Sequence, residues 1–324
     1  MGQLDYLQLN GQILSADDQP PQEEDAMKLT YKTCNVFTDT AFAGNPLGVV
    51  FGGEQLATET MLKIAAEFNY PETTFVLPPT DPNHTAQVRI SSPKIEMPFA
   101  GHPNVGTACV VAQMGELFGK KVNDTLTFEE IAGLVEVTVQ RDGNKVKSAE
   151  LIAPGDLETG ADVAVDKIAA CLSINPEDIV VSTHQPTFTS VGLSFTMVEV
   201  TGPQVLAKCK PVVDHISRLP FEHQKLHVYC NVEEAGADIR CRMFAPTINI
   251  PEDPATGSAN CALAALLTHL SPTSSTEDSY RIIQGEEMGR KSLLFARAQK
   301  VGGKVIEVRI GGNSVEVMSG SLNV

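Results

Sequence analysis

The chain is short of basic residues: 24 Lys and Arg stand against 40 Asp and Glu in 324 residues, so the formal net charge is −16. This deficit argues against a nucleic-acid binder or a protein that binds anionic membranes, because both need a basic surface. No apolar run approaches the ~20 residues of a transmembrane helix. No Lys or Arg precedes residue 28 to form the charged start of a signal peptide. We therefore expect no nucleic-acid partner and no membrane association.

Metal and cofactor motifs are also missing. The seven cysteines include no CxxC pair, which fits reduced thiols better than a disulfide framework or a zinc site. The chain has no dinucleotide-binding GxGxxG pattern, no Walker loop, no HExxH, no GxSxG and no EF-hand loop. We therefore expect a cytoplasmic protein that uses neither an organic cofactor nor a metal ion.

The full chain is 42% hydrophobic and 20% charged, as in folded globular proteins, but residues 1–27 differ from this composition. This segment holds six acidic residues and no basic one. Such a segment cannot bury enough apolar surface to order itself. We expect a disordered acidic N-terminal extension, and the sequence leaves its role open.

The remaining chain repeats. Pro93, Ile95 and Pro98 match Pro246, Ile248 and Pro251 at a constant shift of 153 residues (246 − 93), and similar apolar stretches follow in both halves. Later in each half, two strand-like runs are joined by a Gly-containing hairpin signal, Asp142-Gly143-Asn144 or Gly302-Gly303. A shift of nearly half the chain predicts two copies of one domain, at 28–150 and 151–324.

Most segments within each copy have strand-like patterns. The expected strands are Leu29–Phe37, Thr73–Leu77, Ala86–Ile90, Val135–Gln140, Lys145–Ile152, Ile179–Thr183, Ser194–Val200, Leu226–Cys230, Asp238–Phe244, Lys291–Ala298 and Val305–Ile310. Residues 57–67 and 162–172 have one apolar face and predict surface helices. Val105–Met114 and Ser258–Leu267 are rich in Ala and apolar nearly all round, which is typical of fully buried helices. The expected fold is α+β, with two similar domains, each a curled, mostly antiparallel sheet around a central buried helix.

The most polar segments stand where these two buried helices begin, at Pro98–Thr107 and Pro251–Ala259. A helix start presents free backbone N–H groups and a partial positive charge, so it binds carboxylate or phosphate. Glycine lets a ligand approach the backbone closely. If the two copies face each other, both helix starts point into one cleft. Such a cleft would hold a small acidic molecule without any Arg or Lys.

Each candidate residue also has a purely structural interpretation. Asp253, before Pro254, is either a helix N-cap or a side chain that faces the cleft. Ser258 is either a cap or a ligand-binding group. Glu72, between an expected helix and a strand, is by its position alone a solvated loop residue. His102 should be neutral at a helix start whether or not it takes part in chemistry.

Cys109 and Cys261 occupy nearly corresponding positions in the two copies, which invites comparison with racemases that use a pair of thiols. Cys109 follows Pro103 by six residues, which places it about 9 Å along a buried helix at 1.5 Å per residue. We therefore interpret both cysteines as small core residues.

Six strings, taken together and in order, closely resemble the phenazine-biosynthesis PhzF-like family over residues 30–322. They are Val36-Phe-Thr38, Phe42-Ala-Gly-Asn-Pro46, Glu72-Thr-Thr-Phe-Val76, Pro98-Phe-Ala-Gly-His-Pro103, Glu252-Asp-Pro-Ala-Thr-Gly-Ser-Ala259 and Gln284-Gly-Glu-Glu-Met-Gly-Arg290. The resemblance implies the diaminopimelate-epimerase-like fold, an active site in the cleft between the domains, and a homodimer that needs no metal or organic cofactor. The founding activity of the family is the isomerisation of trans-2,3-dihydro-3-hydroxyanthranilate, in which a proton moves between two ring carbons.

Roles carry over to this chain by motif. The resemblance implies that Glu72 is the acid/base that takes and returns the proton, and that His102 and Asp253 hydrogen-bond the substrate and assist the transfer. It also implies that the carboxylate of a small-molecule substrate is held by Gly101, Gly257 and Ser258, chiefly through backbone N–H groups.

Pro71 departs from the family pattern, because the residue before the catalytic Glu is commonly Ser. The missing hydroxyl leaves the identity of the substrate open, and with it the presence of a phenazine pathway. An amino-acid epimerase or racemase is an alternative function, although neither helix-start loop carries the Cys that a two-thiol mechanism needs. A third alternative is a family member that acts mainly through protein binding.

Overall fold

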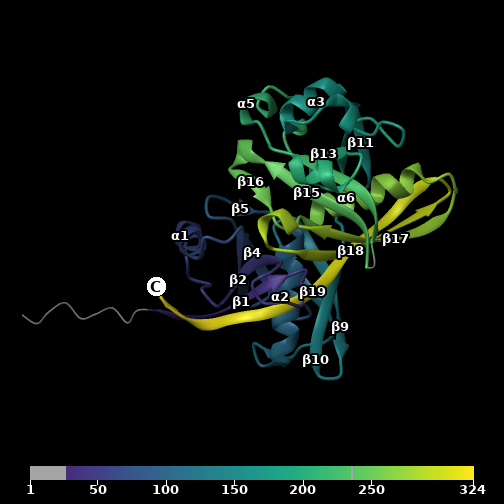
Figure 1. The fold of residues 1–324 in the computed structure, drawn as a ribbon. Coiled ribbons are helices and arrows are strands. Elements are labelled where there is room, and N and C mark those ends of the chain that lie inside the picture. The colour runs from purple at the N-terminus through teal and green to yellow at the C-terminus, as the bar shows by residue number, and fades with distance from the viewer. Residues whose placement is uncertain (1–26, 235) are drawn as a thin grey trace, which may run out of the picture.

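The computed structural model describes residues 27–234 and 236–324 (Figure 1). The predicted acidic extension therefore lies outside the described residues, except for Met27. In the described part of the chain, a mixed sheet of 17 strands and a two-stranded sheet accompany six α-helices, which confirms the expected α+β class.

Most of the described elements are β-strands, which form one large and one small sheet. The strands of the large sheet are β1 Lys28–Val36, β2 Asn45–Phe51, β3 Glu72–Leu77, β4 Ala86–Ser91, β5 Glu96–Met97, β8 Thr125–Glu130, β9 Gly133–Asp142, β10 Lys145–Ile152, β11 Glu158–Asp162, β12 Thr187–Ser190, β13 Ser194–Glu199, β14 Leu226–Glu234, β15 Ala237–Ala245, β16 Ile250–Asp253, β17 Thr276–Gln284, β18 Ser292–Val301 and β19 Lys304–Asn323. The small sheet consists of β6 Glu116–Leu117 and β7 Lys120–Lys121.

The helices fall into long and short ones. The α-helices are α1 Thr58–Phe68, α2 Gly101–Met114, α3 Val165–Leu172, α4 Pro203–Lys208, α5 Val213–Ile216 and α6 Gly257–Leu270. Single 3-10 turns lie at Pro176–Asp178, Phe221–His223, Pro246–Ile248 and Glu286–Met288.

The large sheet is mostly antiparallel, as expected. Its parallel pairs are β2 with β3, β4 with β8, β13 with β14, and β15 with β17. The long C-terminal strand β19 pairs in turn with β18, β10 and β1, and so connects the last part of the chain with the first (Figure 1). The division into domains at residues 150 and 151 stays a prediction.

Helices α2 and α6 are surrounded by strands, and nearly all their residues are buried. Helix α2 packs against β1, β2, β9, β10 and β19, while α6 packs against β12, β13, β17, β18 and β19. Small residues permit this close approach: a Cβ atom at Gly106 would lie 2.6 Å from Leu47 and 2.7 Å from Val36. The two predicted buried helices are confirmed, although both begin earlier than expected, at Gly101 and Gly257.

Most predicted elements are present, although their bounds differ from the expected ones by a few residues. Strand β10 spans the predicted residues, and both Gly-containing turns connect hairpins, β9 to β10 and β18 to β19. The strand expected at Ile179–Thr183 is wrong, because Ile179 makes only an isolated bridge to Val200 and the residues after Val180 leave the sheet. Nine strands were not predicted: β2, β5, β6, β7, β8, β11, β12, β16 and β17.

The cysteines are all unpaired and buried. Within the described residues, no helix has the length and apolar character needed to span a membrane.

Candidate active site

The starts of α2 and α6 touch each other. A Cβ atom at Gly101 would lie 3.5 Å from both the Cα of Gly257 and the backbone N of Ser258. The N-cap positions are Ala100 and Thr256, so the alternative in which Asp253 caps the helix is wrong. Backbone N–H groups of both helices therefore converge on one place, as the sequence predicted.

Glu72 is the first residue of β3, where it lies opposite Leu47 of the parallel strand β2. Its side chain is only 14% exposed, and Oε2 lies 3.4 Å from Nε2 of His102. Burial raises the pKa of Glu72 to about 8, and the negative charge of Asp253 adds to the rise. The interpretation of Glu72 as a solvated loop residue is therefore wrong.

His102 lies in the first turn of α2 with its side chain 6% exposed. Burial lowers the pKa of His102 to about 3, against the smaller opposing effect of a hydrogen bond to the Pro46 backbone. The ring is therefore neutral at ordinary pH. Its Nε2 and the Oε2 of Glu72 make no hydrogen bond within the described chain.

Asp253 ends β16 and receives hydrogen bonds from both halves of the chain. Asn45, from β2, donates Nδ2–H to Oδ1 over 3.0 Å, and Thr256 donates its hydroxyl to Oδ2 over 2.5 Å. Burial raises the pKa of Asp253, while the hydrogen bonds from Thr256 and Asn45 oppose that rise. The structure thus brings Glu72, His102 and Asp253 together at the meeting point of the two helices.

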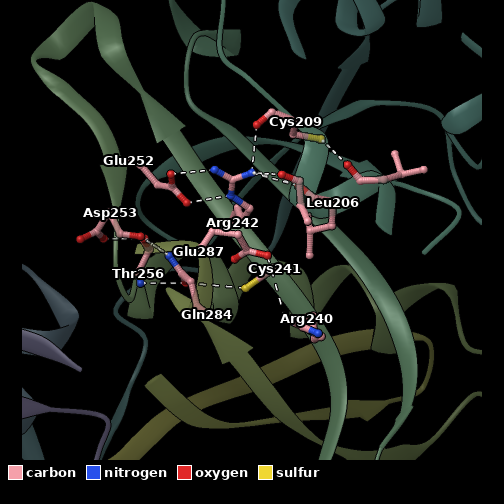
Figure 2. Close-up of polar contacts among 12 residues, drawn as sticks. Leu206, Cys209, Arg240, Cys241, Arg242, Glu252, Asp253, Thr256, Gln284 and Glu287 are labelled. Atoms are coloured by element: carbon pink, nitrogen blue, oxygen red, sulfur yellow. Dashed lines mark hydrogen bonds and ion pairs between the residues drawn. The ribbon is translucent and has the colours of Figure 1, made fainter. Parts of the chain in front are cut away.

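Gln284 holds the loop between Asp253 and α6 (Figure 2). Its Nε2 donates to the Asp253 carbonyl oxygen at 2.8 Å and to the Thr256 hydroxyl oxygen at 3.0 Å, while its Oε1 accepts the Thr256 N–H at 3.0 Å. Gly285 follows with φ +81°, and a Cβ there would lie 2.5 Å from the Pro254 carbonyl oxygen. The glycine is therefore required for this close approach.

Asn45, Thr256 and Gln284 were not predicted as site residues. All three lie in the strings on which the family resemblance rests, and this was the only sequence signal that could have identified them. Nothing in their local sequence indicates that their side chains turn toward Asp253.

A partly buried ion pair anchors the strand that carries Asp253 (Figure 2). Arg242 of β15 donates from Nε and Nη2 to the two carboxylate oxygens of Glu252, each at 2.8 Å. The same guanidinium donates to the carbonyl oxygens of Leu206 at 3.0 Å and Cys209 at 2.9 Å. These contacts fix the residue adjacent to Asp253.

A cavity of about 220 Å³ opens beside the two helix starts. It is lined by Gly101 and Ser258 together with apolar side chains such as Phe99, Leu193 and Ile310. A larger cavity of about 530 Å³, lined by Gln113 and Lys145 among others, contains none of the predicted site residues. Cavity size alone therefore does not identify the site.

The described residues contain no group of three His, Cys, Asp or Glu side chains placed to hold a metal ion. Cys109 and Cys261 are buried, and burial raises the pKa of both thiols well above the usual range. Cys261 also lines the 220 Å³ cavity. A thiol of such high pKa supplies little thiolate, which is the reactive form.

Known proteins resemble this chain over most of its length. The family model described as phenazine biosynthesis-like protein matches residues 34–320. An uncharacterized isomerase of Mesorhizobium japonicum is 36% identical, over 90% of this chain and 98% of its own length. A trans-2,3-dihydro-3-hydroxyanthranilate isomerase of Pseudomonas chlororaphis is 32% identical over the same shares. The crystal structure of a Bacillus anthracis PhzF-family protein superposes with a TM-score of 0.82 at 22% identity, covering 92% of this chain and 100% of that one.

Proposed function

The chain belongs to the phenazine biosynthesis-like protein family. Because its relatives from Mesorhizobium japonicum and Pseudomonas chlororaphis are named isomerases, we propose that it is a cofactor-independent isomerase of a small carboxylate. Glu72 moves a proton between two carbon atoms of the substrate. The substrate is trans-2,3-dihydro-3-hydroxyanthranilate or an analogue of it.

The observation that carries this proposal is the buried carboxyl of Glu72. A proton shuttle must accept a proton in one step and return it in the next, so its pKa should lie near the working pH. A pKa of about 8 meets this requirement. Neutral His102, at 3.4 Å, does not hold Glu72 permanently ionised, as an imidazolium would.

The reaction proceeds in two proton transfers. The Glu72 carboxylate removes a proton from one carbon, and the electron pair of that C–H bond shifts through the neighbouring double bond. The Glu72 carboxylic acid then delivers the proton to a second carbon, so the substrate and product have the same composition. His102 and Asp253 hydrogen-bond the substrate and keep the reacting carbons beside Glu72. Positioned acid/base catalysis of this kind contributes roughly 10²–10⁴-fold in rate.

The carboxylate of the substrate binds where α2 and α6 begin. Gly101, Gly257 and Ser258 offer backbone N–H groups there, and each helix start contributes about 0.3–2 kcal/mol toward an anion. The apolar lining of the adjacent cavity suits a small hydrocarbon ring.

The test is proton NMR in D₂O with trans-2,3-dihydro-3-hydroxyanthranilate and with the wild-type protein beside Glu72→Gln. Turnover by the wild type with deuterium entering the product, and its loss in Glu72→Gln, supports the isomerase and the role of Glu72. If the wild-type protein leaves this compound unchanged, the substrate is a different small carboxylate.

Glu130→Gln is the matched control, because burial also raises the pKa of Glu130 to about 8. Glu130 is not part of the site described above, so we expect this variant to retain turnover. Equal loss of turnover in both variants would contradict the specific role of Glu72.

A further inference from the structure

The side-chain amide of Asn45 joins the two parts of the site. It is fully buried at the start of β2. Nδ2 lies 2.9 Å from the Ala255 carbonyl oxygen, 3.0 Å from Asp253 Oδ1 and 3.4 Å from His102 Nδ1. An amide has two N–H hydrogens, which go to the two nearer oxygens. The opposite orientation would place Oδ1 against those oxygens, so the contacts themselves determine the orientation.

Folding stability alone does not account for this amide. Oδ1 of Asn45 is buried and has no hydrogen-bond partner among the described residues. An unpaired buried acceptor is unfavourable for folding. The two Nδ2 hydrogens of Asn45 thus bond the Asp253 loop, while Oδ1 stays unpaired. Because this arrangement is unfavourable for folding, it indicates that Asn45 has a role in the site.

The loop before Asn45 is held from the other half of the chain. Arg290 donates to the carbonyl oxygens of Gly44 at 2.8 Å and Ala43 at 3.1 Å, and the Gly44 N–H donates to the Lys291 carbonyl oxygen at 3.2 Å. Gly44 has φ +64°, and a Cβ there would clash with the Val36 carbonyl oxygen. The backbone that presents Asn45 is thus fixed independently of its side chain.

We propose that Asn45 is a positioning residue, which fixes the orientation of the Asp253 carboxylate across the site and favours its charged form. Oδ2 of Asp253 is held from its own loop by Thr256, whereas Oδ1 is held across the site by Asn45. Asn45 is the described side chain that bonds this carboxylate from the other half of the chain. Its relevance to catalysis rests on the proposed function, but its effect on Glu72 does not need a substrate.

Removing the amide should change the titration of Glu72. Asp253 would lose a donor, so the pKa of Asp253 would rise further, and less negative charge would face Glu72. The pKa of Glu72 would then fall, because Asp253 contributes to its rise. The other titratable or charged groups around the two carboxyls are His102 on α2, Glu252 on β16 and its partner Arg242 on β15.

The first test is a carboxyl ¹³C NMR titration of Glu72 in the substrate-free protein, with its signal assigned from Glu72→Gln. The midpoint of Glu72 should be lower in Asn45→Ala than in the wild type. Asn45→Ser, whose side chain is too short to reach Asp253, serves if Asn45→Ala does not fold. A folded variant with an unchanged midpoint would overturn the proposal.

Thr107→Val is the control for general loss of a buried polar contact. Thr107 is fully buried on α2 and shares a 2.8 Å hydrogen bond with Thr74, whereas the carboxylate of Asp253 is bonded by Asn45 and Thr256. We expect a lower melting temperature in Thr107→Val with the Glu72 midpoint unchanged. A shift of equal size in both variants would mean that Asn45 acts only through the stability of the fold.

The second test uses Asn45→Asp and steady-state kinetics. The new carboxyl group has nearly the same shape, but it can donate to Asp253 only when protonated. Its turnover relative to the wild type should therefore recover as the pH falls, whereas that of Asn45→Ala should not. We expect kcat of Asn45→Ala to fall by about 10²-fold with little change in KM. A constant ratio across pH for Asn45→Asp would contradict the hydrogen-bonding role.

The outcomes separate the two proposals. If the wild-type protein does not turn over the tested substrate, the proposed function fails for that compound, and the titration still decides the role of Asn45. If the wild type is active but the titration midpoint of Glu72 is the same in Asn45→Ala as in the wild type, only the inference about Asn45 fails.

Discussion

Nε2 of His102 and Oε2 of Glu72 lie 3.4 Å apart, yet the two groups do not form an ion pair. Burial lowers the pKa of His102 to about 3 and raises that of Glu72 to about 8, so near pH 7 the imidazole is neutral and the carboxyl is mostly protonated. An imidazolium in this place would stabilise the carboxylate and depress its pKa. Neutral His102 instead leaves Glu72 free to gain and lose a proton.

The stability of the protein should depend on pH through Glu72. With a folded pKa of about 8 against an unfolded value of about 4.3, folded Glu72 keeps a proton that the unfolded chain releases. This contribution to stability is therefore lost as the pH rises through that window. His102, whose folded pKa of about 3 lies below its unfolded value of about 6.5, has the opposite effect on stability between these two values. The effects of Glu72 and His102 therefore cancel between about pH 4.3 and 6.5.

Glu72→Gln removes only the Glu72 contribution. Between pH 6.5 and 8, the stability of this variant relative to the wild type should grow by on the order of 2 kcal/mol. Urea unfolding of both proteins at pH 6.5 and at pH 8 measures the change. Any difference in unfolding free energy that does not depend on pH cancels when the two pH values are compared. A difference that stays flat with pH would mean that the pKa of folded Glu72 is not raised.

Asp253→Asn should lower the pKa of Glu72, but only in part, because burial is the larger cause of its rise. The variant also places an amide against the donors of Asn45 and Thr256, so we expect kcat/KM to fall by about 10²-fold. The acid limb of the pH profile should move to lower pH. Asp156→Asn, at an exposed position that pairs with Lys304, is the control and should leave the profile unchanged.

Gly101→Ala should weaken binding of the substrate carboxylate while the protein stays folded. The added methyl would meet Gly257 and Ser258 at 3.5 Å, an ordinary van der Waals distance, but it would cover N–H groups at the helix starts. Losing one hydrogen bond to a charged group costs about 1.5–3 kcal/mol, so KM should rise at least about tenfold. In Gly202→Ala, where the nearest contact is the Gln204 side chain at 3.5 Å, KM should not change. An unchanged KM in Gly101→Ala would place the carboxylate elsewhere.

Arg242→Met should destabilise the fold, because it leaves the Glu252 carboxylate without its bidentate partner. Breaking one side of a fully buried pair costs about 3–5 kcal/mol, and we expect a loss toward the low end of this range because the Glu252 side chain is 18% exposed. The double variant Arg242→Met with Glu252→Leu should recover much of this loss, as measured by urea unfolding. Lys32→Met removes a more exposed pair with Glu316 and should cost about 1 kcal/mol or less. If the double variant is no more stable than Arg242→Met, the unpaired charge is not the cause.

Local patterns predicted several elements well. Strand β10 has the predicted bounds, and the Ala-rich stretches within α2 and α6 are buried helices, because an apolar surface all round a helix leaves no face for water. The failures have non-local causes. Strand β19 was expected to end at Ile310 but continues to Asn323, because β1 supplies a partner for its second half.

The candidate site likewise contains residues that the sequence predicted and one that it did not. Glu72, His102 and Asp253 were predicted through the family resemblance, and the structure places them together with Gly101, Gly257 and Ser258. Asn45 was missed as a site residue because its hydrogen bond to Asp253 spans 208 positions in the sequence. A polar residue at the start of an apolar strand does not by itself indicate such a partner.

The sequence by itself determined the α+β class, the two buried helices with glycine and polar residues at their starts, and the family. These properties depend on residue chemistry and on periodicity over a few neighbouring positions, which the chain carries locally. Only the tertiary structure decided that the two helix starts touch and that Glu72 is buried against a neutral His102. It also decided that Asn45 bonds Asp253. Burial and proximity set the pKa values of these groups, and both arise only when distant segments pack together.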